Sequence, residues 1–503
     1  MPVLHAGLFS NRQGVCLSKN LLSVLKGITY TQSGVLPEKI EKITCSSKDT
    51  VPGALFFAIR GENADGHNFI TEAINNGACA LVVEEIVEPT RVPQIIVSDT
   101  KAALSRAAAN FFNHPTQTMT IVGVTGTNGK TTTVYLLNHI LITAGHRCGT
   151  VGTLGYSIND QWFPSNLTTP DSITIQSIFA KMHAENVSVA VMEVSSHSLA
   201  LHRVADIRFQ GGVFTNISQD HLDFHKSLTD YAQTKVRLFQ IVEPSGFLVY
   251  NRDDHYAPIF MQAAKARAYS FSLSPKADYY WLSGVEFNNG ISGTIHTPTQ
   301  NIAITSKLSG EFNLRNILGV VAVAENLEIA PAIIQKSLAE VPFIPGRLQE
   351  ISQSGQPRVF IDYAHTPDAI SNVLKTLRSM VIAGGHLIVV FGCGGNRDKS
   401  KRPLMAQAVE KFAELAIVTT DNPRFEEPHS IMQDIIPGFS KSYHYLLVED
   451  RREAIRQALI LAQPLDIVAI LGKGHEPYQE IKGVRHPFHD SIIVKEYFNA
   501  AGS

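Results

Sequence analysis

Cysteine is scarce in this chain and follows no recognisable spacing. The cysteines stand far apart, are odd in number and form no C-x-x-C pair; the five are Cys16, Cys45, Cys79, Cys148 and Cys393. A disulfide framework or a cysteine-based zinc site needs paired, closer spacing, so the sequence argues against both. The pattern instead predicts a protein of the reducing cytoplasm.

Long apolar runs are also missing. A membrane-spanning helix needs roughly twenty consecutive apolar residues, and no stretch approaches that length. The opening residues, MPVLHAGLFSNRQGV, lack the basic stretch, apolar core and cleavage site of a secretory signal. We therefore expect neither membrane insertion nor secretion.

An excess of either charge is absent as well. Lysine and arginine total 43 against 45 aspartate and glutamate residues, which gives a formal net charge of -2 at pH 7. This balance disfavours general binding to nucleic acid or to acidic membranes, because both depend on an excess of positive charge. Any anionic ligand must be held by local groups.

What the chain does have is length and a regular alternation of elements. Its 503 residues are too many for one hydrophobic core and suggest about three domains. Short apolar runs alternate with helical patterns, as in PQIIVSD before TKAALSRAAANFFN and HLIVVFGC before RPLMAQAVEKFAELA, which predicts an α/β fold. Turn-rich breaks predict domains at 1–98, 99–344 and 345–503.

The stretch GVTGTNGKTTT, residues 123–133, resembles a phosphate-binding loop but departs from its usual spacing. The pattern G-x-x-x-x-G-K-[ST] requires glycine where this chain has Val124. The context fits, because the β-branched run TMTIVGVTG precedes the loop and the helical run KTTTVYLLNHILITAG follows it. At such a helix start, backbone N–H groups form an anion nest, Lys130 adds a charge for the phosphates and the Thr131 hydroxyl can bind Mg²⁺. The alternative is a glycine-rich turn with an exposed lysine.

Two further segments carry candidate metal ligands. Glu193 ends the strand-like part of VSVAVMEVSSHSLALHRV, where an acidic residue would face a nucleotide-bound metal. His221 lies in FTNISQDHLDFH, a segment that is too polar for a core. Taken alone, a glutamate after a strand, such as Glu193, is more often a surface or capping residue. His221 could be either a capping residue or a metal ligand.

Seven motifs, in order, resemble the Mur ligases and within them the MurE branch, the UDP-N-acetylmuramoyl-tripeptide synthetases of peptidoglycan synthesis. They are TGTNGKTTT, MEVSSHSLALHRV, FTNISQDHLDFH, GEFNLRNILG, PGRLQ, DYAHTPDA and GKGHEPYQ, and they cover nearly the whole chain. The loop of this family has the shorter spacing G-T-x-G-K-[ST]. Gly126, three residues before Gly129, is therefore the family glycine.

The resemblance implies an ATP-dependent ligase that forms an amide bond through an acyl phosphate, with Mg²⁺. It implies a UDP-sugar-binding first domain, a central P-loop-type ATPase domain and a Rossmann-like third domain that brings the amino acid. The implied substrates are ATP, UDP-N-acetylmuramoyl-L-alanyl-D-glutamate and meso-diaminopimelate, and we expect a cytoplasmic monomer. The rivals are a lysine-adding member of the branch, a folylpolyglutamate synthetase-like ligase and a nucleotide-switch ATPase.

The resemblance also assigns residues to the nucleotide site. The implied ATP contacts are Gly126, Thr127, Asn128, Gly129, Lys130, Thr131, Thr132, Asn313, Asn316, Arg347, Asp362 and His365. The implied metal site uses Thr131, Glu193, His221 and Lys235, and the implied catalytic residues are Lys130, Glu193, His221 and Lys235. Without the family, EFNLRN predicts only a helix start and DYAHTP only a strand end with a proline turn. Lys235 would be solvent-exposed, whereas the family pattern implies a carbamylated lysine near a second Mg²⁺.

The UDP-muramoyl dipeptide is expected to bind in the first two domains. The implied contacts are Ser47 and the GENADG turn at 61–66 in the first, and Thr168, Thr169, Ser195 and Arg203 in the second.

The string TTDNPRFEEP, residues 419–428, bears on which amino acid is added. On its own it predicts a turn with a solvated arginine. It follows the strand-like AELAIVTT, however, and so lies where α/β ligand sites gather. Asp421, Asn422, Pro423 and Arg424 match the motif of family members that add meso-diaminopimelate, whose distal carboxylate a guanidinium can grip. The remaining implied contacts are Arg397, Gly472 and Glu476.

Overall fold

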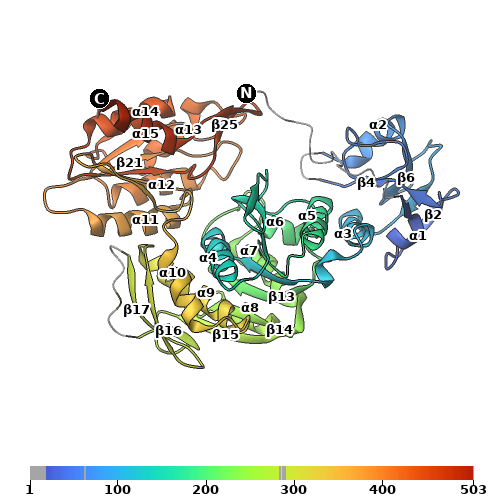
Figure 1. Ribbon diagram of the computed structural model, residues 1–503. Helices are drawn as coiled ribbons and strands as arrows, with labels where there is room; N and C mark the ends of the chain where they lie inside the picture. The colour runs from blue at the N-terminus through green and yellow to red at the C-terminus, as the bar shows by residue number, and fades with distance from the viewer. Residues whose placement is uncertain (1–17, 62–63, 283–284, 286–289, 502–503) are drawn as a thin grey trace. The chain divides into compact units, whose positions relative to one another are not determined.

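The computed structural model describes residues 18–61, 64–282, 285 and 290–501, and these fall into two compact units (Figure 1). The first unit contains the described chain up to residue 119 together with 169–186 and 197–208, and the second contains the remainder. Parallel strands alternate with helices in both, so the predicted α/β class is confirmed. The three domain boundaries stay a prediction. Residues 62 and 63 of the predicted GENADG turn lie outside the described part.

The first unit is built on a sheet with the strand order β2-β7-β6-β5-β4, in which only β2 is antiparallel to its neighbour. Side chains alternate between two cores, since Leu55 and Phe57 lie in one while Phe56 lies in the other. The strands are β2 (Thr31–Ser33), β4 (Lys42–Thr44), β5 (Ala54–Phe57), β6 (Ala78–Val83) and β7 (Gln94–Ile96). The helices are α1 (Leu21–Val24), α2 (Ile70–Asn75), α3 (Thr100–Phe111) and α5 (Ser172–Ala184).

The structure groups helix α3 with this first unit, whereas the predicted boundary places it in the second block. Asp99 caps the helix by accepting hydrogen bonds from the N–H groups of Lys101 and Ala102. Its alanine-rich face, with Leu104 and Phe111, packs into the core that β5 and β6 form. The sequence indicates a helix here but not which sheet the helix covers.

The second unit contains a long mixed sheet with the order β11-β10-β9-β12-β8-β13-β14-β15-β16-β17-β18. The strands from β9 to β16 along this order are parallel, and antiparallel strands are added at both edges. The strands are β8 (Thr120–Thr125), β9 (Cys148–Gly152), β10 (Gly155–Ile158), β11 (Gln161–Phe163), β12 (Val189–Glu193), β13 (Phe209–Phe214), β14 (Val242–Asn251), β15 (Arg267–Ser272), β16 (Tyr279–Trp281), β17 (Ile291–His296) and β18 (Asn301–Ser306). The helices that follow these strands include α4 (Lys130–Thr143), α7 (Leu228–Ile241), α8 (Ala257–Ala263), α9 (Glu311–Asn326) and α10 (Pro331–Glu340).

Strand β8 lies between β12 and β13 and leads into the predicted phosphate loop. Val122 and Val124 pack into the core that contains α4 and α9. Gly123 points to the opposite face, where a Cβ atom would lie 2.8 Å from Phe209 and 3.0 Å from Leu238 of α7. Glycine at this position therefore lets α7 pack close to the strand that carries the loop.

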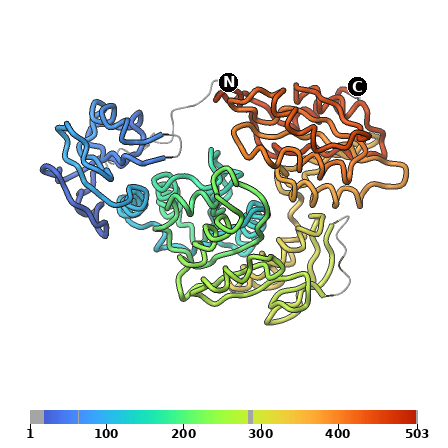
Figure 2. The backbone as a smooth tube through the Cα atoms, turned by 180° about the vertical axis from the view of Figure 1, so that it is seen from behind, coloured from blue at the N-terminus to red at the C-terminus, as the bar shows by residue number. Residues whose placement is uncertain are grey.

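Another sheet of the second unit has the order β19-β20-β24-β21-β22-β23 and is parallel except for β19. Figure 2 shows the backbone of this part of the chain, in orange and red, from behind. Helices α11, α12 and α13 pack on one face and α14 and α15 pack on the other, as a Rossmann-like domain requires. Figure 1 shows α11 and α14 on opposite sides of this sheet. The strands are β19 (Gln349–Ile351), β20 (Arg358–Asp362), β21 (Leu387–Phe391), β22 (Leu415–Val418), β23 (Tyr445–Leu447) and β24 (Ile467–Leu471), with a separate hairpin of β25 (Tyr478–Ile481) and β26 (Val484–Pro487). The helices are α11 (Pro367–Met380), α12 (Lys401–Glu410), α13 (Pro428–Ile435), α14 (Arg451–Leu461) and α15 (Asp490–Ala501).

Helix length also bears on the question of membrane insertion. Within the described ranges, no helix combines the length and the apolar character that crossing a membrane requires.

Helices α14 and α15 are joined by a fully buried ion pair. Arg451 Nε and Nη2 donate to the Asp490 carboxylate at 2.9 and 2.8 Å, and both side chains are 0% exposed. Removing the carboxylate leaves a buried charge uncompensated, so we expect Asp490→Ala to lower the free energy of unfolding by about 3 to 5 kcal/mol. Urea denaturation followed by circular dichroism measures the loss.

The same two helices offer a matched control. Arg452 Nη1 donates to Glu496 at 2.7 Å, but the two side chains are 43% and 53% exposed. We expect Glu496→Ala to cost roughly 0 to 1 kcal/mol, because solvent screens an exposed pair. Equal losses in the two variants would contradict the prediction.

Candidate active site

The predicted phosphate loop connects the end of β8 to the start of α4. Gly126 and Gly129 have φ angles of 146° and 86°, which L side chains rarely adopt. A Cβ atom would also overlap Thr215 Oγ1 at the first position and Asn316 Oδ1 at the second. The predicted strand-loop-helix context is confirmed, and Val124 is a buried strand residue.

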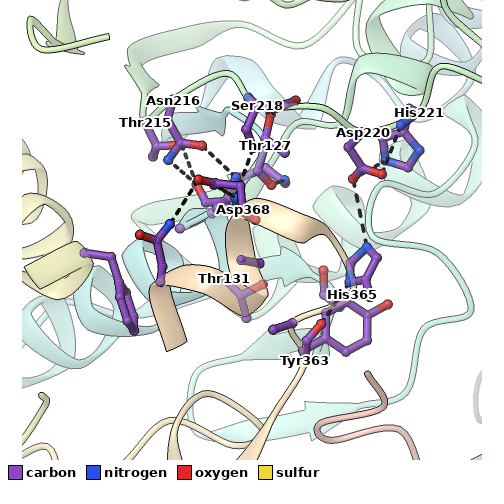
Figure 3. A pocket seen from close by; sticks show the side chains of 18 of the residues that line it. Thr127, Thr131, Thr215, Asn216, Ser218, Asp220, His221, Tyr363, His365 and Asp368 are labelled. Carbon is purple, nitrogen blue, oxygen red and sulfur yellow. Dashed lines mark hydrogen bonds and ion pairs between the residues drawn. The ribbon is translucent and has the colours of Figure 1, made fainter. Parts of the chain in front are cut away.

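A polar segment directly after β13 holds this loop (Figure 3). Thr215 Oγ1 and Asn216 Nδ2 donate to Asn128 O at 2.6 and 3.1 Å. In return, the Asn128 N–H donates to Asn216 Oδ1 at 3.0 Å, and the Ser218 N–H donates to Thr127 Oγ1 at 3.0 Å. Sequence reasoning missed Thr215, Asn216 and Ser218. The sequence signal that could have found them is a run of short polar residues directly after a strand. Because β13 pairs with β8 in parallel, the residues that follow β13 lie beside the loop that follows β8.

Lys130 folds back over the loop. Its Nζ donates to Gly126 O and to Thr127 O, both at 2.8 Å. Burial lowers the pKa of this ammonium, and the nearby carboxylates of Glu193 and Asp220 offset only part of that effect. The lysine therefore shields two loop carbonyls from each other and lies at the helix start, rather than extending into solvent.

Glu193 ends β12, beside the strand that carries the loop, and is 1% exposed. Its carboxylate accepts hydrogen bonds from the Thr153 N–H at 2.7 Å and from Thr153 Oγ1 at 3.1 Å. A Cβ atom on Gly152 would lie 2.5 Å from Glu193 Oε1, so a larger residue there would displace the Glu193 carboxylate. The surface position that Glu193 alone would favour is wrong.

In the QDHLDFH segment, Asp220 is the residue around which the charged groups gather. It lies 3.4 Å from His221 Nε2, 3.9 Å from His365 Nε2 and 3.7 Å from Lys401 Nζ (Figure 3 shows the two histidines). Burial opposes its ionisation, but His221, Lys401 and His365 outweigh burial and hold the pKa of Asp220 well below its usual range. Within this segment Asp220 and His225 are 6% and 3% exposed, whereas His221 is half-buried and Asp223 is exposed.

Lys235 is buried, in contrast to the exposed position that its polar helix suggests. It is 1% exposed, and its Nζ donates to Gly126 O at 2.9 Å, the oxygen that Lys130 also contacts. The ammonium lies 4.5 Å from the centre of the Tyr231 ring. Burial first, and then the charge of Lys130, lowers the pKa of Lys235 well below its ordinary value.

Arg347 reaches the loop from the segment after α10. Its Nη2 donates to Thr131 Oγ1 at 2.9 Å, and its guanidinium lies 4.8 Å from the centre of the Tyr363 ring. Asp362, at the end of β20, accepts a hydrogen bond from the Leu348 N–H at 2.7 Å. Burial raises the pKa of Asp362, and Arg347 acts in the opposite direction.

The start of α9 supplies Asn313 and Asn316, which are both buried. Asn316 Nδ2 donates to Asn313 Oδ1 at 3.0 Å. Asp368, which sequence reasoning missed, accepts a hydrogen bond from Asn128 Nδ2 at 3.0 Å. Both the helix start predicted from EFNLRN and the strand end predicted from DYAHTP are confirmed, and both border the loop.

The predicted Asp-Asn-Pro-Arg string follows the end of β22. Asn422 Nδ2 donates to Glu476 Oε2 at 2.8 Å, which joins the string to the segment after β24. Arg424 has a φ of 53°; its Nη1 donates to Gly395 O at 2.7 Å and its Nε lies 3.7 Å from Glu480. Side chains from two strand ends therefore meet, as the sequence predicts.

These groups line one cavity of about 650 Å³ in the second unit. The predicted residues along its wall are Thr127, Asn128, Gly129, Lys130, Thr131, Thr132, Thr168, Glu193, Ser195, His221, Lys235, Asn316, Arg347, Asp362, His365, Arg397, Asp421, Asn422, Arg424, Gly472 and Glu476. The phosphate loop and the Asp-Asn-Pro-Arg string thus share a cavity, although about 290 residues of chain separate them.

Three domain families of known proteins match successive parts of this chain, which together make up most of its length. The Mur ligase family catalytic domain matches residues 39–112, the Mur ligase middle domain matches 124–324, and the Mur ligase glutamate ligase domain matches 346–474. A relative from Aquifex aeolicus (strain VF5), named UDP-N-acetylmuramoyl-L-alanyl-D-glutamate--2,6-diaminopimelate ligase, is 42% identical over 475 residues, which cover 94% of this chain and 97% of the relative. The chain belongs to the Mur ligase family.

Two further comparisons agree with this assignment. A protein of the same name from Caldanaerobacter subterraneus subsp. tengcongensis is 40% identical to this Mur ligase over 481 residues, which cover 95% of this chain and 98% of the relative. A solved structure of a UDP-N-acetylmuramoyl-L-alanyl-D-glutamate--2,6-diaminopimelate ligase is 32% identical, has a TM-score of 0.65 and covers 93% of this chain and 96% of its own.

The residues predicted to contact a UDP-muramoyl dipeptide are divided between the two units of this Mur ligase. In the first unit, Ser47 is buried and Arg203 Nη1 donates to Thr169 O at 3.1 Å. In the second unit, Thr168 and Ser195 line the cavity. Each group is polar, as a diphosphate and sugar require.

Proposed function

We propose that this Mur ligase uses ATP to join meso-diaminopimelate to UDP-N-acetylmuramoyl-L-alanyl-D-glutamate in peptidoglycan precursor synthesis. The observation that carries the proposal is the shared cavity, because it contains both the phosphate loop and Arg424. The names of the two relatives support it, since they are 42% and 40% identical over nearly the whole chain.

The reaction needs both parts of that cavity, the phosphate loop for ATP and the region of Arg424 for the amino acid. A carboxylate does not condense with an amine in water, because its leaving group is poor. Transfer of the γ-phosphoryl group of ATP to the substrate carboxylate releases ADP and forms an acyl phosphate. The amine then attacks the acyl carbon, and phosphate leaves from the tetrahedral intermediate. Two anions meet in the first step, so fixed cations must offset their repulsion.

Lys130 and Arg347 are the cations we propose for that task. Lys130 Nζ donates to two loop carbonyls in the free protein, and on ATP binding it would donate to phosphate oxygens instead. The backbone N–H groups from Gly129 to Thr132 lie at the start of α4 and would bind the same phosphates. Arg347 already donates to Thr131, and so lies within reach of the phosphate chain.

Thr131, Glu193, His221 and Lys235 are the residues we propose for the Mg²⁺ sites. In the described part of the chain, no group of three or more His, Cys, Asp or Glu side chains could hold a metal ion by itself. Mg²⁺ usually binds through one or two carboxylates together with substrate phosphates and water, so a buried glutamate and a hydroxyl fit an ion that the nucleotide carries. Such an ion would neutralise charge on the phosphoryl group during transfer.

We also propose that Lys235 carries a carbamate. A neutral amine forms a bond to the carbon of CO₂ and releases one proton, so a lowered pKa is the required condition. Burial and Lys130 supply that condition, since they depress the pKa of Lys235 well below its ordinary value. The modification would convert two adjacent cations, both at Gly126 O, into an ion pair.

Replacing Lys235 tests the carbamate. We expect Lys235→Ala to lower turnover by roughly a hundredfold or more, because a charged group at the reaction centre is lost. Acetate or formate should restore part of the activity by supplying a carboxylate. Lys226→Ala, which removes an exposed lysine from the segment before the same helix, should have no effect. Full activity of Lys235→Ala without added acid, or no carbamate signal in ¹³C NMR with labelled bicarbonate, would refute the proposal.

The other end of the cavity would select the amino acid. Diaminopimelate differs from lysine by a carboxylate at the far end of its side chain, and we propose that Arg424 binds this group. Glu476 and Arg397 would bind the remaining charged groups of the substrate, with Glu476 on an ammonium. L-lysine would place an ammonium near the Arg424 guanidinium without a carboxylate to offset the repulsion, which would weaken its binding. Arg424 would therefore both favour meso-diaminopimelate and disfavour L-lysine.

The rest of the proposal concerns the UDP-muramoyl dipeptide and the cellular role of the enzyme. Ser47, Thr168, Thr169, Ser195 and Arg203 would bind the UDP-muramoyl dipeptide through hydroxyl and backbone groups. We propose that the enzyme acts as a cytoplasmic monomer, without nucleic acid or membrane, and that it serves cell-wall synthesis and hence cell shape and division.

Phosphate release tests the proposed class of reaction. We expect release only when ATP, UDP-N-acetylmuramoyl-L-alanyl-D-glutamate and meso-diaminopimelate are all present, with one tripeptide product per phosphate. Hydrolysis without an amino acid, or stimulated by a partner protein, would indicate a nucleotide switch instead. Addition of glutamate to a folate would indicate a folylpolyglutamate synthetase.

A further inference from the structure

Lys473 is a fully buried lysine that none of the proposed roles uses. It follows β24 and lies between Gly472 and Gly474, whose φ angles are 108° and 54°. A Cβ atom at Gly472 would overlap Asp421 Oδ2, and one at Gly474 would lie 2.9 Å from Gly346 O. These two glycines allow the backbone to turn so tightly that the lysine side chain enters the interior.

The ammonium of Lys473 contacts three residues that we assign to the amino-acid site. Its Nζ donates to Asn422 Oδ1 at 2.9 Å and to Glu476 Oε2 at 3.1 Å, and it lies 3.9 Å from Asp421 Oδ1. Those three residues line the cavity, whereas the Lys473 side chain is 0% exposed and lies behind the cavity wall.

These contacts fix the orientation of two groups in the wall. Asn422 Oδ1 accepts from Lys473 and from the Glu480 N–H at 2.9 Å, so its amide nitrogen must point to Glu476. Glu476 Oε2 then accepts from Asn422 Nδ2 at 2.8 Å and from Lys473. Glu476 Oε1 takes part in neither bond; it accepts the Tyr363 hydroxyl at 3.4 Å and keeps a lone pair for a further donor.

The charge balance also depends on Lys473. Asp421 and Glu476 place two carboxylates at one wall, and like charges in a poorly solvated site repel each other strongly. Arg451 attracts both of them, but its guanidinium is held by Asp490 and donates to Leu471 O at 3.0 Å. Lys473 is the cation that contacts Glu476 directly.

We propose that Lys473 is a positioning residue for the amino-acid substrate. It holds Glu476 and Asn422 in one arrangement and compensates the charge of Asp421 and Glu476, so that Glu476 Oε1 can accept a hydrogen bond from a substrate ammonium. This inference rests on the proposed function, because it assigns the ammonium to meso-diaminopimelate.

Lys473→Met and Lys473→Gln test the inference in the full-length enzyme. The first replaces the ammonium by an apolar group of similar length, and the second keeps a hydrogen-bond donor without charge. We expect both variants to raise the KM for meso-diaminopimelate by about tenfold or more, because Lys473 and Glu476 belong to one ion-pair network and are energetically coupled. The KM values for ATP and for the UDP-muramoyl dipeptide should stay within about threefold, because Lys473 contacts neither of those sites. Lys482→Met, which removes an exposed lysine from the adjacent hairpin, is the matched control and should leave all three KM values unchanged.

A double-mutant cycle separates positioning from a general structural role. In a Glu476→Gln background, Lys473→Met should add less than about threefold to the KM for meso-diaminopimelate, because Lys473 acts through Glu476. Equal rises in all three KM values, or fully additive effects in the cycle, would overturn the inference. Wild-type enzyme that does not use meso-diaminopimelate would overturn the proposed function instead, and unchanged variants of an enzyme that does use it would overturn only the role of Lys473.

Discussion

A Lys130→Ala variant will fold but lose ligase turnover by about a thousandfold or more, because it removes a fixed charge from the proposed phosphoryl-transfer site. Lys130 lies at the start of α4, and its Nζ contacts the loop carbonyls of Gly126 and Thr127. The side chain is within the electrostatic influence of Glu193 and Asp220, and so belongs to the region where we expect negative charge to gather.

Phosphate release with saturating substrates measures this loss. Melting temperature and the KM for meso-diaminopimelate report whether the rest of the protein is intact, since Lys130 Nζ donates to loop carbonyls and not to the residues assigned to the amino acid. Lys336→Ala, which removes an exposed lysine from α10, should retain full turnover. A folded Lys130→Ala enzyme with near wild-type turnover would show that the loop does not transfer phosphate.

The second large effect concerns Arg424. We expect Arg424→Ala to lower kcat/KM for meso-diaminopimelate by about a hundredfold or more, because it removes the proposed charge-assisted, bidentate contact to the distal carboxylate. The preference over L-lysine should disappear as well. Arg424 is well placed for this role, because Gly395 O holds its Nη1 at 2.7 Å and Glu480 lies 3.7 Å from its Nε.

Arg424→Lys refines the test. It keeps the positive charge but cannot form two parallel hydrogen bonds to a carboxylate, so we expect it to recover only part of the preference. Arg456→Ala, on the exposed face of α14, is the control for loss of an arginine in the same domain. Retention of the full preference in Arg424→Ala would assign amino-acid selection to other residues.

Local patterns in the sequence predicted the elements well. The run TMTIVGVTG forms β8 and the run KTTTVYLLNHILITAG forms α4, because strand and helix periodicities are properties of short segments. Likewise, the Asp-Asn-Pro-Arg string follows β22 as expected. These predictions needed no knowledge of distant residues.

Contacts between distant segments could not be predicted in the same way. Lys235 lies in a polar helix, and its burial depends on α7 packing over Gly123 and on contact with Gly126 O. Asp220 and Lys401 meet only because the second unit brings together segments about 180 residues apart. Lys473 shows the same limit, since nothing in GKGHE indicates that the lysine lies behind Asp421 and Glu476.

The identity of the added residue tests the central claim most directly. Wild-type enzyme is incubated with ATP, Mg²⁺, UDP-N-acetylmuramoyl-L-alanyl-D-glutamate and an equal mixture of meso-diaminopimelate and L-lysine, and the product is identified by mass spectrometry. We predict a product that contains meso-diaminopimelate almost exclusively, formed with one phosphate per tripeptide. A product that contains mainly L-lysine, or phosphate release without any tripeptide, would contradict the account.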